Sequence, residues 1–368
     1  MPPFAPGNST GNGEEPVFSI RPRIFKLVNC RKKTFLSPMK QEPTSGPTGA
    51  NRSAAVLTRR DFVARVALAG AAWPLGRRAE AAVNAGGAPV IHFFSKPLYK
   101  MSYRDTAAFV AECGFGGIDY TVREAQGHVL PERVAEDLPR AVEAARAAGL
   151  KVEMITTDIT DPRGPHTEKV LRAAAGQGVK VYRLGNFNYD LKLGVWQTLE
   201  KLKPALKELA ALNQSLGIHG AIQNHAGTRV GGALWDLYEL VREADPRWLG
   251  VQYDIRHAVV EGAQSWPVTL RLLSPWIRCL DLKDFKWQQA PGKASIENVP
   301  LGEGVVPLDA YFKLVRELKV SGPISLHFEY PPFERATGTP TEEEKRASFA
   351  AAMRKDLQVL QQFLAKYR

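Results

Sequence analysis

Short runs of aliphatic and β-branched residues recur along the chain from Ala88 onward, and amphipathic segments separate them. Short apolar runs indicate buried strands, whereas apolar positions spaced three and four apart indicate helices. The runs predict strands at residues 90–95, 117–121, 152–156, 181–185, 220–224, 250–254, 277–283 and 324–329. The amphipathic segments predict helices that include residues 131–148, 167–176, 196–216, 308–318 and 342–367.

The strict alternation of predicted strands and helices points to one fold class. A strand that is followed by a helix pairs in parallel with the next strand, which gives a parallel sheet with helical crossovers. Eight such units over residues 88–368 predict a single (β/α)₈ TIM barrel rather than an open doubly wound sheet. The G-x-G-x-x-G sequence of dinucleotide-binding folds does not follow the first predicted strand.

The residues before the barrel have a different composition. Residues 1–57 are rich in Pro, Gly, Ser, Thr and Asn without sustained periodicity, so we expect a disordered leader there. Residues 58–81 contain the pair Arg59-Arg60, then an apolar run, then the small-x-small sequence Ala79-Glu80-Ala81, which is the order of a secretory signal peptide. This segment resembles a twin-arginine export signal. The alternative is an amphipathic helix with a chance arginine pair.

An export signal implies both a partner and a location. We expect the chain to use the twin-arginine export machinery and to be periplasmic or extracellular after cleavage. The apolar run from Val63 to Leu75 is too short for a stable membrane anchor.

The net charge of +11 suggests a nucleic-acid-binding protein, but the distribution of the charge argues against that function. Residues 1–81 contain 13 Lys and Arg against 5 Asp and Glu, and the remaining residues contain 36 against 33. The predicted barrel is therefore nearly neutral, and we expect no nucleic-acid partner. The three cysteines are too few and too scattered for a disulfide framework or a zinc knuckle.

Polar residues gather near the ends of the last four predicted strands. They are Gln223, Asn224, His225, Asp254, Arg256, His257, Asp281, Lys283, Asp284, His327 and Glu329. In a TIM barrel the reactive groups lie at the C-terminal ends of the strands. Residues two apart share a face, so a buried strand carries such pairs only where they converge on a cavity. The sequence therefore predicts a site at this end.

These segments resemble the xylose isomerase-like barrels, a sugar phosphate isomerase/epimerase family that also includes apurinic endonucleases. The family has Glu-Asn-His on strand five, Asp-x-x-His on strand six, His-x-Lys-Asp on strand seven and a terminal Glu on strand eight. It also has a Gly-Glu-Gly loop, matched here by Gly302-Glu303-Gly304. The resemblance covers residues 88–368 and implies a TIM barrel that acts on a small-molecule carbohydrate.

The resemblance also implies a divalent metal, with Mn²⁺ or Mg²⁺ favoured over zinc. Its ligands would be Gln223, Asp254, Asp281 and Glu329. Two of them depart from the family pattern, since Gln223 stands in place of Glu and Asp281 in place of His. Both still offer oxygen atoms to a hard cation. A degenerate site that holds no metal is the alternative.

The Gln also affects the expected proton transfer. Gln223 cannot accept a proton, which disfavours epimerisation by two opposed carboxylates. Glu329 is the candidate base, with His225, His257 or His327 as the partner acid. Lys283 could polarise a carbonyl or hold an enediolate oxygen. Each of these also has a structural interpretation, as a hydrogen-bonded packing residue or, for Lys283, as an ion pair with Asp284.

A further set of residues near the predicted strand ends could contact substrate: His257, Arg183, Arg256, Trp287 and His128. Four more residues on or after the first three strands could shape the same pocket: His92, Lys96, Arg123 and Glu153. Arg183 could bind a hydroxyl or a carboxylate, or could fill a barrel layer. Trp287 could stack on a sugar ring, or could be an ordinary strand-end aromatic.

The expected function is metal-assisted proton abstraction next to the carbonyl of a sugar or keto-sugar, leading to isomerisation, epimerisation or elimination. The first alternative is a DNA-repair endonuclease, which requires a multi-zinc cluster, and the chain has only 7 His. The second is an exported sugar-binding barrel with a decayed catalytic centre. Fold alone does not distinguish these functions.

Overall fold

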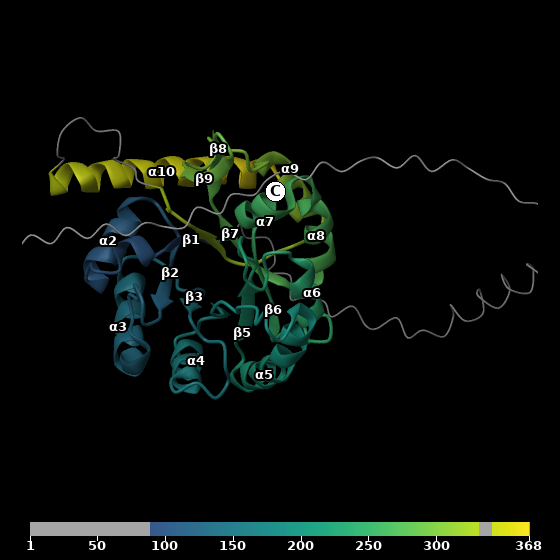
Figure 1. Cartoon of the computed structure of the whole chain (residues 1–368). Coiled ribbons are helices and arrows are strands. Elements are labelled where there is room, and N and C mark those ends of the chain that lie inside the picture. Colours follow the sequence, from purple (N-terminus) through teal and green to yellow (C-terminus); the bar gives the residue numbers. More distant parts are fainter. Residues whose placement is uncertain (1–88, 331–340, 368) are drawn as a thin grey trace, which may run out of the picture. The chain divides into compact units, whose positions relative to one another are not determined.

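The computed structural model describes residues 89–330 and 341–367, so the predicted leader and signal segment lie outside the described residues. Eight parallel strands close into a barrel in the order β1-β2-β3-β4-β5-β6-β7-β10 (Figure 1). They are β1 Ile91–Phe94, β2 Gly117–Val122, β3 Met154–Thr157, β4 Val181–Arg183, β5 His219–Gln223, β6 Leu249–Asp254, β7 Ile277–Leu282 and β10 Ile324–Leu326. The predicted TIM barrel is confirmed.

Helices connect the strands around the outside of the barrel (Figure 1). They are α2 Tyr103–Glu112, α3 Val134–Ala147, α4 Thr167–Gly176, α5 Val195–Leu216, α6 Trp235–Val241, α7 Ile255–Gly262, α8 Trp266–Leu273, α9 Leu308–Glu317 and α10 Glu342–Lys366. Local signals set several of their ends. Ser102 caps α2 by accepting from the Asp105 backbone N–H, and Thr341 and Glu344 form a capping box at the start of α10. Gly217 ends α5 at φ 67°, a left-handed conformation that glycine adopts without strain.

Several predicted strands extend too far. β4 ends at Arg183 and β10 ends at Leu326, whereas the apolar patterns continue to residues 185 and 329. The alternation of apolar and polar residues indicates on which face of a strand each side chain lies. It does not indicate whether the backbone pairs with a neighbouring strand. The pattern therefore overestimates strand length where the chain approaches the site.

The segment after β7 also differs from the expectation. The predicted strand ends at residue 283, and beyond it the chain forms an antiparallel hairpin that was not predicted, of β8 (Asp284–Ala290) and β9 (Lys293–Val299). Gly292 lies in the turn at φ 71°. The Pro291-Gly292 pair between two alternating segments is a turn signal that the strand assignment passed over.

The barrel interior has an apolar layer followed by a polar one. Four buried residues form a separate apolar cluster: Met154, Val181, Ala221 and Cys279. Two residues further along the same strands lie the buried polar side chains of Thr156, Arg183, Gln223 and Asp281. Alternate residues of a strand share a face, so each strand passes from core to site within two residues.

Candidate active site

A polar pocket of about 330 Å³ opens at the C-terminal ends of the strands. Among the residues that line it are Arg183, Gln223, His225, Lys283 and Glu329, all predicted from the sequence. Five of the candidates therefore lie around one cavity, at the end of the barrel where they were expected. This volume is at the small end for ligand pockets, which suits a monosaccharide.

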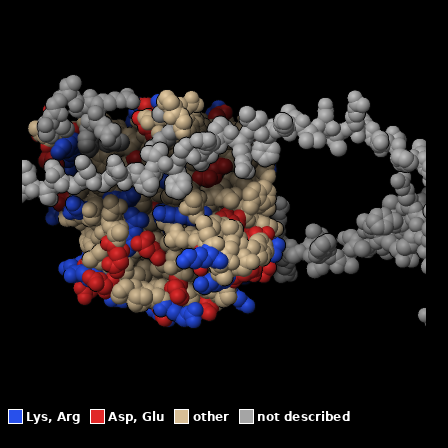
Figure 2. Space-filling model, viewed as in Figure 1, with Lys and Arg blue, Asp and Glu red and all other residues tan. Residues whose placement is uncertain are grey.

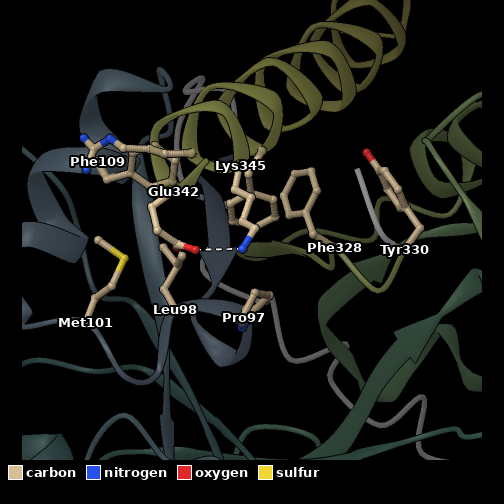
Figure 3. Close-up of a pocket in the computed structure, with 10 residues that line it drawn as sticks. Pro97, Leu98, Met101, Phe109, Phe328, Tyr330, Glu342 and Lys345 are labelled. Carbon is tan, nitrogen blue, oxygen red and sulfur yellow. Dashed lines mark hydrogen bonds and ion pairs between the residues drawn. The ribbon is translucent and has the colours of Figure 1, made fainter. Parts of the chain in front are cut away.

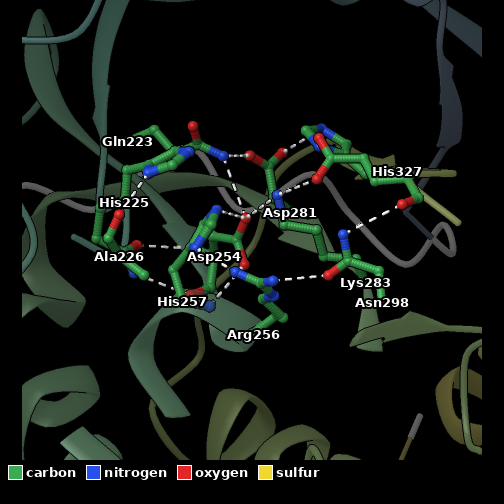
Figure 4. A network of polar contacts seen from close by, with 12 residues as sticks. Gln223, His225, Ala226, Asp254, Arg256, His257, Asp281, Lys283, Asn298 and His327 are labelled. Carbon is green, nitrogen blue, oxygen red and sulfur yellow. Dashed lines mark hydrogen bonds and ion pairs between the residues drawn. The ribbon is translucent and has the colours of Figure 1, made fainter. Parts of the chain in front are cut away.

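The centre of the site contains a buried lysine between two carboxylates. Lys283 Nζ lies 3.3 Å from Asp254 Oδ2 and 3.2 Å from Glu329 Oε2, and its side chain is almost fully buried (Figure 4). Burial alone would lower the pKa of Lys283, but the Asp254 and Glu329 carboxylates outweigh it, so the net pKa is raised. Lys283 is therefore an ammonium ion.

A second internal cation lies beside Asp281. His327 Nε2 is 3.4 Å from Asp281 Oδ1, and its ring stacks on Phe94 with centroids 4.1 Å apart. Burial would lower the pKa of His327, but the charge of Asp281 and hydrogen bonding raise it to about 9. His327 is thus an imidazolium at neutral pH and is a counter-ion for Asp281. The predicted role of His327 as a partner acid stays a prediction.

Gln223 turns its amide nitrogen toward the carboxylates. Its Nε2 donates to Asp254 Oδ2 at 3.2 Å and also to Asp281, which accepts from Gln252 Nε2 as well. The Gln223 Oε1 atom is buried and accepts no hydrogen bond from any described residue. Because Gln223 lines the pocket, this oxygen is available to a substrate hydroxyl.

The donor set does not fit the divalent metal that the resemblance implies. The carboxylates of Asp254, Asp281 and Glu329 are already paired with the Lys283 ammonium, the His327 imidazolium and the Gln223 amide. A divalent ion between them would lie next to two buried positive charges. Within residues 89–330 and 341–367, no group of three or more His, Cys, Asp or Glu side chains is arranged to hold a metal. The four-residue ligand set stays a prediction, and we derive no step through it.

His225 has a free nitrogen toward the pocket. Its Nδ1 is 2.9 Å from the Ala226 carbonyl oxygen, which can only accept, so Nδ1 carries the proton and the lone pair is on Nε2. Burial, followed by the positive charge of Lys283, lowers the pKa of His225 to about 4. The imidazole is therefore neutral at neutral pH and can accept a proton.

His257 packs on His225 but is held differently. Their ring centroids are 4.0 Å apart. Arg256 Nη1 donates to His257 Nδ1 at 3.0 Å, so the proton of the neutral ring is on Nε2, 3.5 Å from Asp254 Oδ2. Burial holds the pKa of His257 well below its ordinary value. His257 is therefore a neutral ring that packs on His225, and its catalytic and substrate-binding roles stay predictions.

The remaining predicted substrate contacts lie away from the pocket lining. Arg256 Nη2 donates to Asn298 Oδ1 at 2.6 Å, which ties α7 to the hairpin. His128 hydrogen-bonds Thr106 Oγ1 and is oriented by packing. Trp287 lies on β8 and is half exposed. Only Arg183 of this group lines the pocket with the reactive residues, and the substrate-binding roles of the others stay predictions.

Several lining residues were not selected from the sequence. Asp158, Asn186 and Arg229 line the pocket, each a few residues past a strand end. Their position just after a predicted strand is the sequence feature that could have identified them. Asn298 could not be found in this way, because it reaches the site from the unexpected hairpin, where its Nδ2 donates to the Glu329 carbonyl.

Asp284 fixes the Gly-Glu-Gly loop rather than pairing with Lys283. Its carboxylate accepts from the backbone N–H groups of Gly302, Gly304 and Val306 at 3.0 to 3.1 Å. A Cβ at Gly304 would lie only 2.1 Å from Asp284 Oδ1. The close approach of Asp284 explains why residue 304 is a glycine, and it gives the Gly302-Glu303-Gly304 loop a structural role.

A second pocket of about 580 Å³ lies beside α10 and has a largely apolar wall (Figure 3). Phe109, Phe328 and Phe349 line it, and Glu342 and Lys345 form an ion pair at its edge. The lysine, histidines and carboxylates of the polar pocket are absent from this lining. Of these two pockets, the strand-end pocket is therefore the one that contains the reactive groups.

The described surface carries no single-sign field on the face that Figure 2 shows, where acidic and basic side chains are interspersed. None of the described helices combines the length and apolar character needed to cross a membrane.

Known structures share this fold. A 3-keto-D-glucoside 4-epimerase from E. coli is 14% identical with a TM-score of 0.53, covering 72% of this chain and 98% of its own. A D-tagatose 3-epimerase-like protein is 15% identical with a TM-score of 0.56, covering 76% and 98%. A Mycobacterium smegmatis xylose isomerase-like TIM barrel protein in complex with magnesium is 16% identical with a TM-score of 0.52, covering 75% and 98%.

No curated protein sequence matches this chain. At identities this low the structural neighbours establish the fold and not the activity. The family model described as xylose isomerase-like TIM barrel matches residues 107–357, which is more than half of the chain. The protein therefore belongs to the xylose isomerase-like TIM barrel family.

Proposed function

We propose that this protein moves a proton on the carbon next to the carbonyl of a keto-sugar, as an isomerase, epimerase or lyase. The observation that carries the proposal is the arrangement of Lys283 and His225 in one pocket. An ammonium ion and a neutral imidazole with a free lone pair are the two groups that enolisation needs. The sugar epimerases among the structural neighbours support the substrate class.

His225 Nε2 is the base in this proposal. It takes the proton from the carbon, the electron pair of that C–H bond forms the carbon–carbon double bond, and the carbonyl oxygen becomes an enolate oxygen. The Lys283 ammonium stabilises that negative charge. Delivery of a proton to the same carbon from the opposite face gives epimerisation. Its delivery to the former carbonyl carbon, with transfer of the α-hydroxyl proton to the enolate oxygen, gives isomerisation. Loss of a protonated β-hydroxyl as water gives elimination.

Glu329 has a supporting role rather than the predicted role of base. Burial would raise its pKa, but the positive charges of Lys283 and His327 lower it well below the ordinary Glu value. A carboxylate held so firmly in its ionised form is a weak base. Glu329 instead holds Lys283 charged and in place, so the positive charge expected from a divalent metal comes from the chain itself.

Hydrogen exchange tests this function directly. The full-length protein is incubated with a panel of keto-sugars in D₂O, and deuterium at the carbon next to the carbonyl is followed by NMR. We expect exchange in the wild type, a loss of about 10²-fold or more in His225→Gln, and no change in His166→Gln, a histidine at the start of α4.

Two outcomes would contradict parts of this proposal. If sugars bind but no carbon-bound hydrogen exchanges, the protein is a sugar-binding barrel with a decayed centre. If His225→Gln exchanges as fast as the wild type, His225 is not the base. Export by the twin-arginine machinery is a separate proposal, and cell fractionation with an Arg59→Lys, Arg60→Lys variant tests it.

A further inference from the structure

Two arginines that line the pocket, Arg123 and Arg183, have side chains that form no ion pair or hydrogen bond with a carboxylate of the described residues. Arg183 is buried, with 6% of its surface exposed, and makes no hydrogen bond or ion pair with any residue of the described ranges. Its Nε atom is fully buried and unpartnered, and so is the Nε of Arg123. Burying a guanidinium without an anion is costly, so an unpaired one that lines a cavity indicates a ligand.

The two guanidinium groups lie close enough to affect each other. The pKa of Arg123 is lowered, by burial first and by the positive charge of Arg183 second. Arg123 is otherwise contacted by Phe94, whose ring centroid is 6.0 Å from the Arg123 Cζ atom. A pair of desolvated like charges is stabilised by an anion that both can reach.

The whole lining has an excess of positive charge. Five basic residues line the pocket, Lys96, Arg123, Arg183, Arg229 and Lys283, against the acidic Asp158 and Glu329. Lys283 and Glu329 are paired with each other, which leaves four cations against one carboxylate. The carboxylates of Asp119, Asp158 and Glu329 act on Arg123 only at longer range, so a neutral sugar would leave this excess partly uncompensated.

We propose that Arg123 and Arg183 form a subsite for a carboxylate, so that the substrate is a sugar acid. This rests on the proposed function and names its substrate class. The planar fork of each arginine matches a carboxylate through two parallel hydrogen bonds. Asp158 in the lining disfavours the larger charge of a phosphate, and none of the lining residues is a glycine that could offer close backbone N–H groups to one.

Binding calorimetry with matched probes tests the subsite. D-Glucuronate and D-glucuronamide differ only in the charged group, and D-glucose 6-phosphate places a phosphate at the equivalent carbon. We expect glucuronate to bind about tenfold or more tighter than the amide, since hydrogen bonds to a charged group are among the stronger ones. Added salt is expected to narrow the difference only slightly, because the pair is buried.

Variants assign the effect to the two residues. Arg183→Met and Arg123→Met are expected to remove the preference for glucuronate, whereas Arg104→Met, on the exposed face of α2, is expected to keep it. The comparison of probes on the wild type stands even if a buried variant fails to fold. Equal affinity for glucuronate and glucuronamide overturns the subsite, and tight binding of the phosphate alone overturns the carboxylate assignment.

The outcome is separable from that of the proposed function. Binding of glucuronate in His225→Gln, together with loss of exchange, supports both. Exchange on a neutral keto-sugar without any preference for a carboxylate retains the proton-transfer function and removes the sugar acid. A preference for the carboxylate without exchange retains the subsite and removes the enzyme.

Discussion

Lys283 Nζ lies 3.3 Å from Asp254 Oδ2 inside the barrel, where the family resemblance places a metal ion. The ammonium group lies between two of the carboxylates that the resemblance names as metal ligands. A covalently attached cation cannot be chelated, and its charge is single and directional. The site therefore keeps an electrophile while its ligand set has changed at Gln223 and Asp281.

Metal removal distinguishes this arrangement from a metal-assisted one. We expect the purified full-length protein to contain divalent metal well below stoichiometric amounts, by elemental analysis. Dialysis against EDTA is expected to leave the melting temperature and the exchange rate unchanged, because the carboxylates already have their counter-ions. Stoichiometric Mn²⁺ or Mg²⁺ whose removal abolishes exchange would restore Gln223, Asp254, Asp281 and Glu329 as ligands.

Replacing the ammonium is expected to be costly. Lys283→Met leaves the buried Asp254 and Glu329 carboxylates without their counter-ion, which should lower the free energy of unfolding by about 3–5 kcal/mol. Lys286→Met, on the exposed side of β8, should change it by less than about 0.5 kcal/mol. Urea denaturation measures both. Addition of Mn²⁺ should stabilise Lys283→Met and not the wild type, and an equal response of the two proteins would contradict the exchange of metal for ammonium.

The barrel and the location of its site were predictable because alternation fixes the face of each strand residue. Gln223, Asp281 and Lys283 lie at the ends of predicted strands, and the structure brings them together around Asp254. The orientation of the Gln223 amide was not predictable, because spacing does not tell which of its two atoms faces the carboxylates. Sequence matching to a metal-binding family therefore gave the right residues and left their chemistry open.

The hairpin shows a different limit. Phe285 and Trp287 alternate with polar residues as a continuing strand would, and the pattern gives no sign that pairing changes from barrel to hairpin. The antiparallel partner, Lys293–Val299, is defined by long-range contact. Asn298 reaches Arg256 and Glu329 only through that contact, so its place in the site could not be read locally.

The protonation state of His225 predicts the pH dependence of exchange. The lone pair on Nε2 is available above the pKa of His225, which is lowered to about 4. The pH profile of kcat/KM should therefore be flat between about pH 6 and 8 and should fall only on further acidification. An acid limb near pH 6.5, the ordinary histidine range, would contradict the assignment of His225 as the buried base.

The glycine at residue 304 is expected to be required by contact rather than by flexibility. In Gly304→Ala the new Cβ would meet Asp284 Oδ1 at 2.1 Å and break the hydrogen bonds that hold the loop. We expect a loss of about 2–4 kcal/mol in the free energy of unfolding, measured in urea. Gly176→Ala is the control, since a Cβ there meets nothing within 4 Å, and it should be neutral or stabilising. Equal effects of the two substitutions would rule out the contact explanation.

Asp356 of α10 should make stability depend on pH. Its Oδ2 accepts from Tyr330 Oη at 2.8 Å and its Oδ1 from the Leu301 N–H at 3.1 Å, and burial raises its pKa to about 7. The folded state holds this proton more tightly than the unfolded chain, in which the pKa is near 4. The stabilisation is therefore complete below about pH 4 and is lost as the pH rises toward 7.

Comparison with Asp356→Asn isolates this contribution. The free energy of unfolding of the wild type minus that of the variant should fall by roughly 2–4 kcal/mol between pH 4 and 7 and stay constant above pH 8. Groups that titrate elsewhere cancel in the difference. Urea unfolding at pH 4.5, 6 and 8 is sufficient to measure it. A difference that rises with pH would mean that Asp356 is stabilised as the carboxylate by Tyr330 and the Leu301 N–H, and that these two donors outweigh burial.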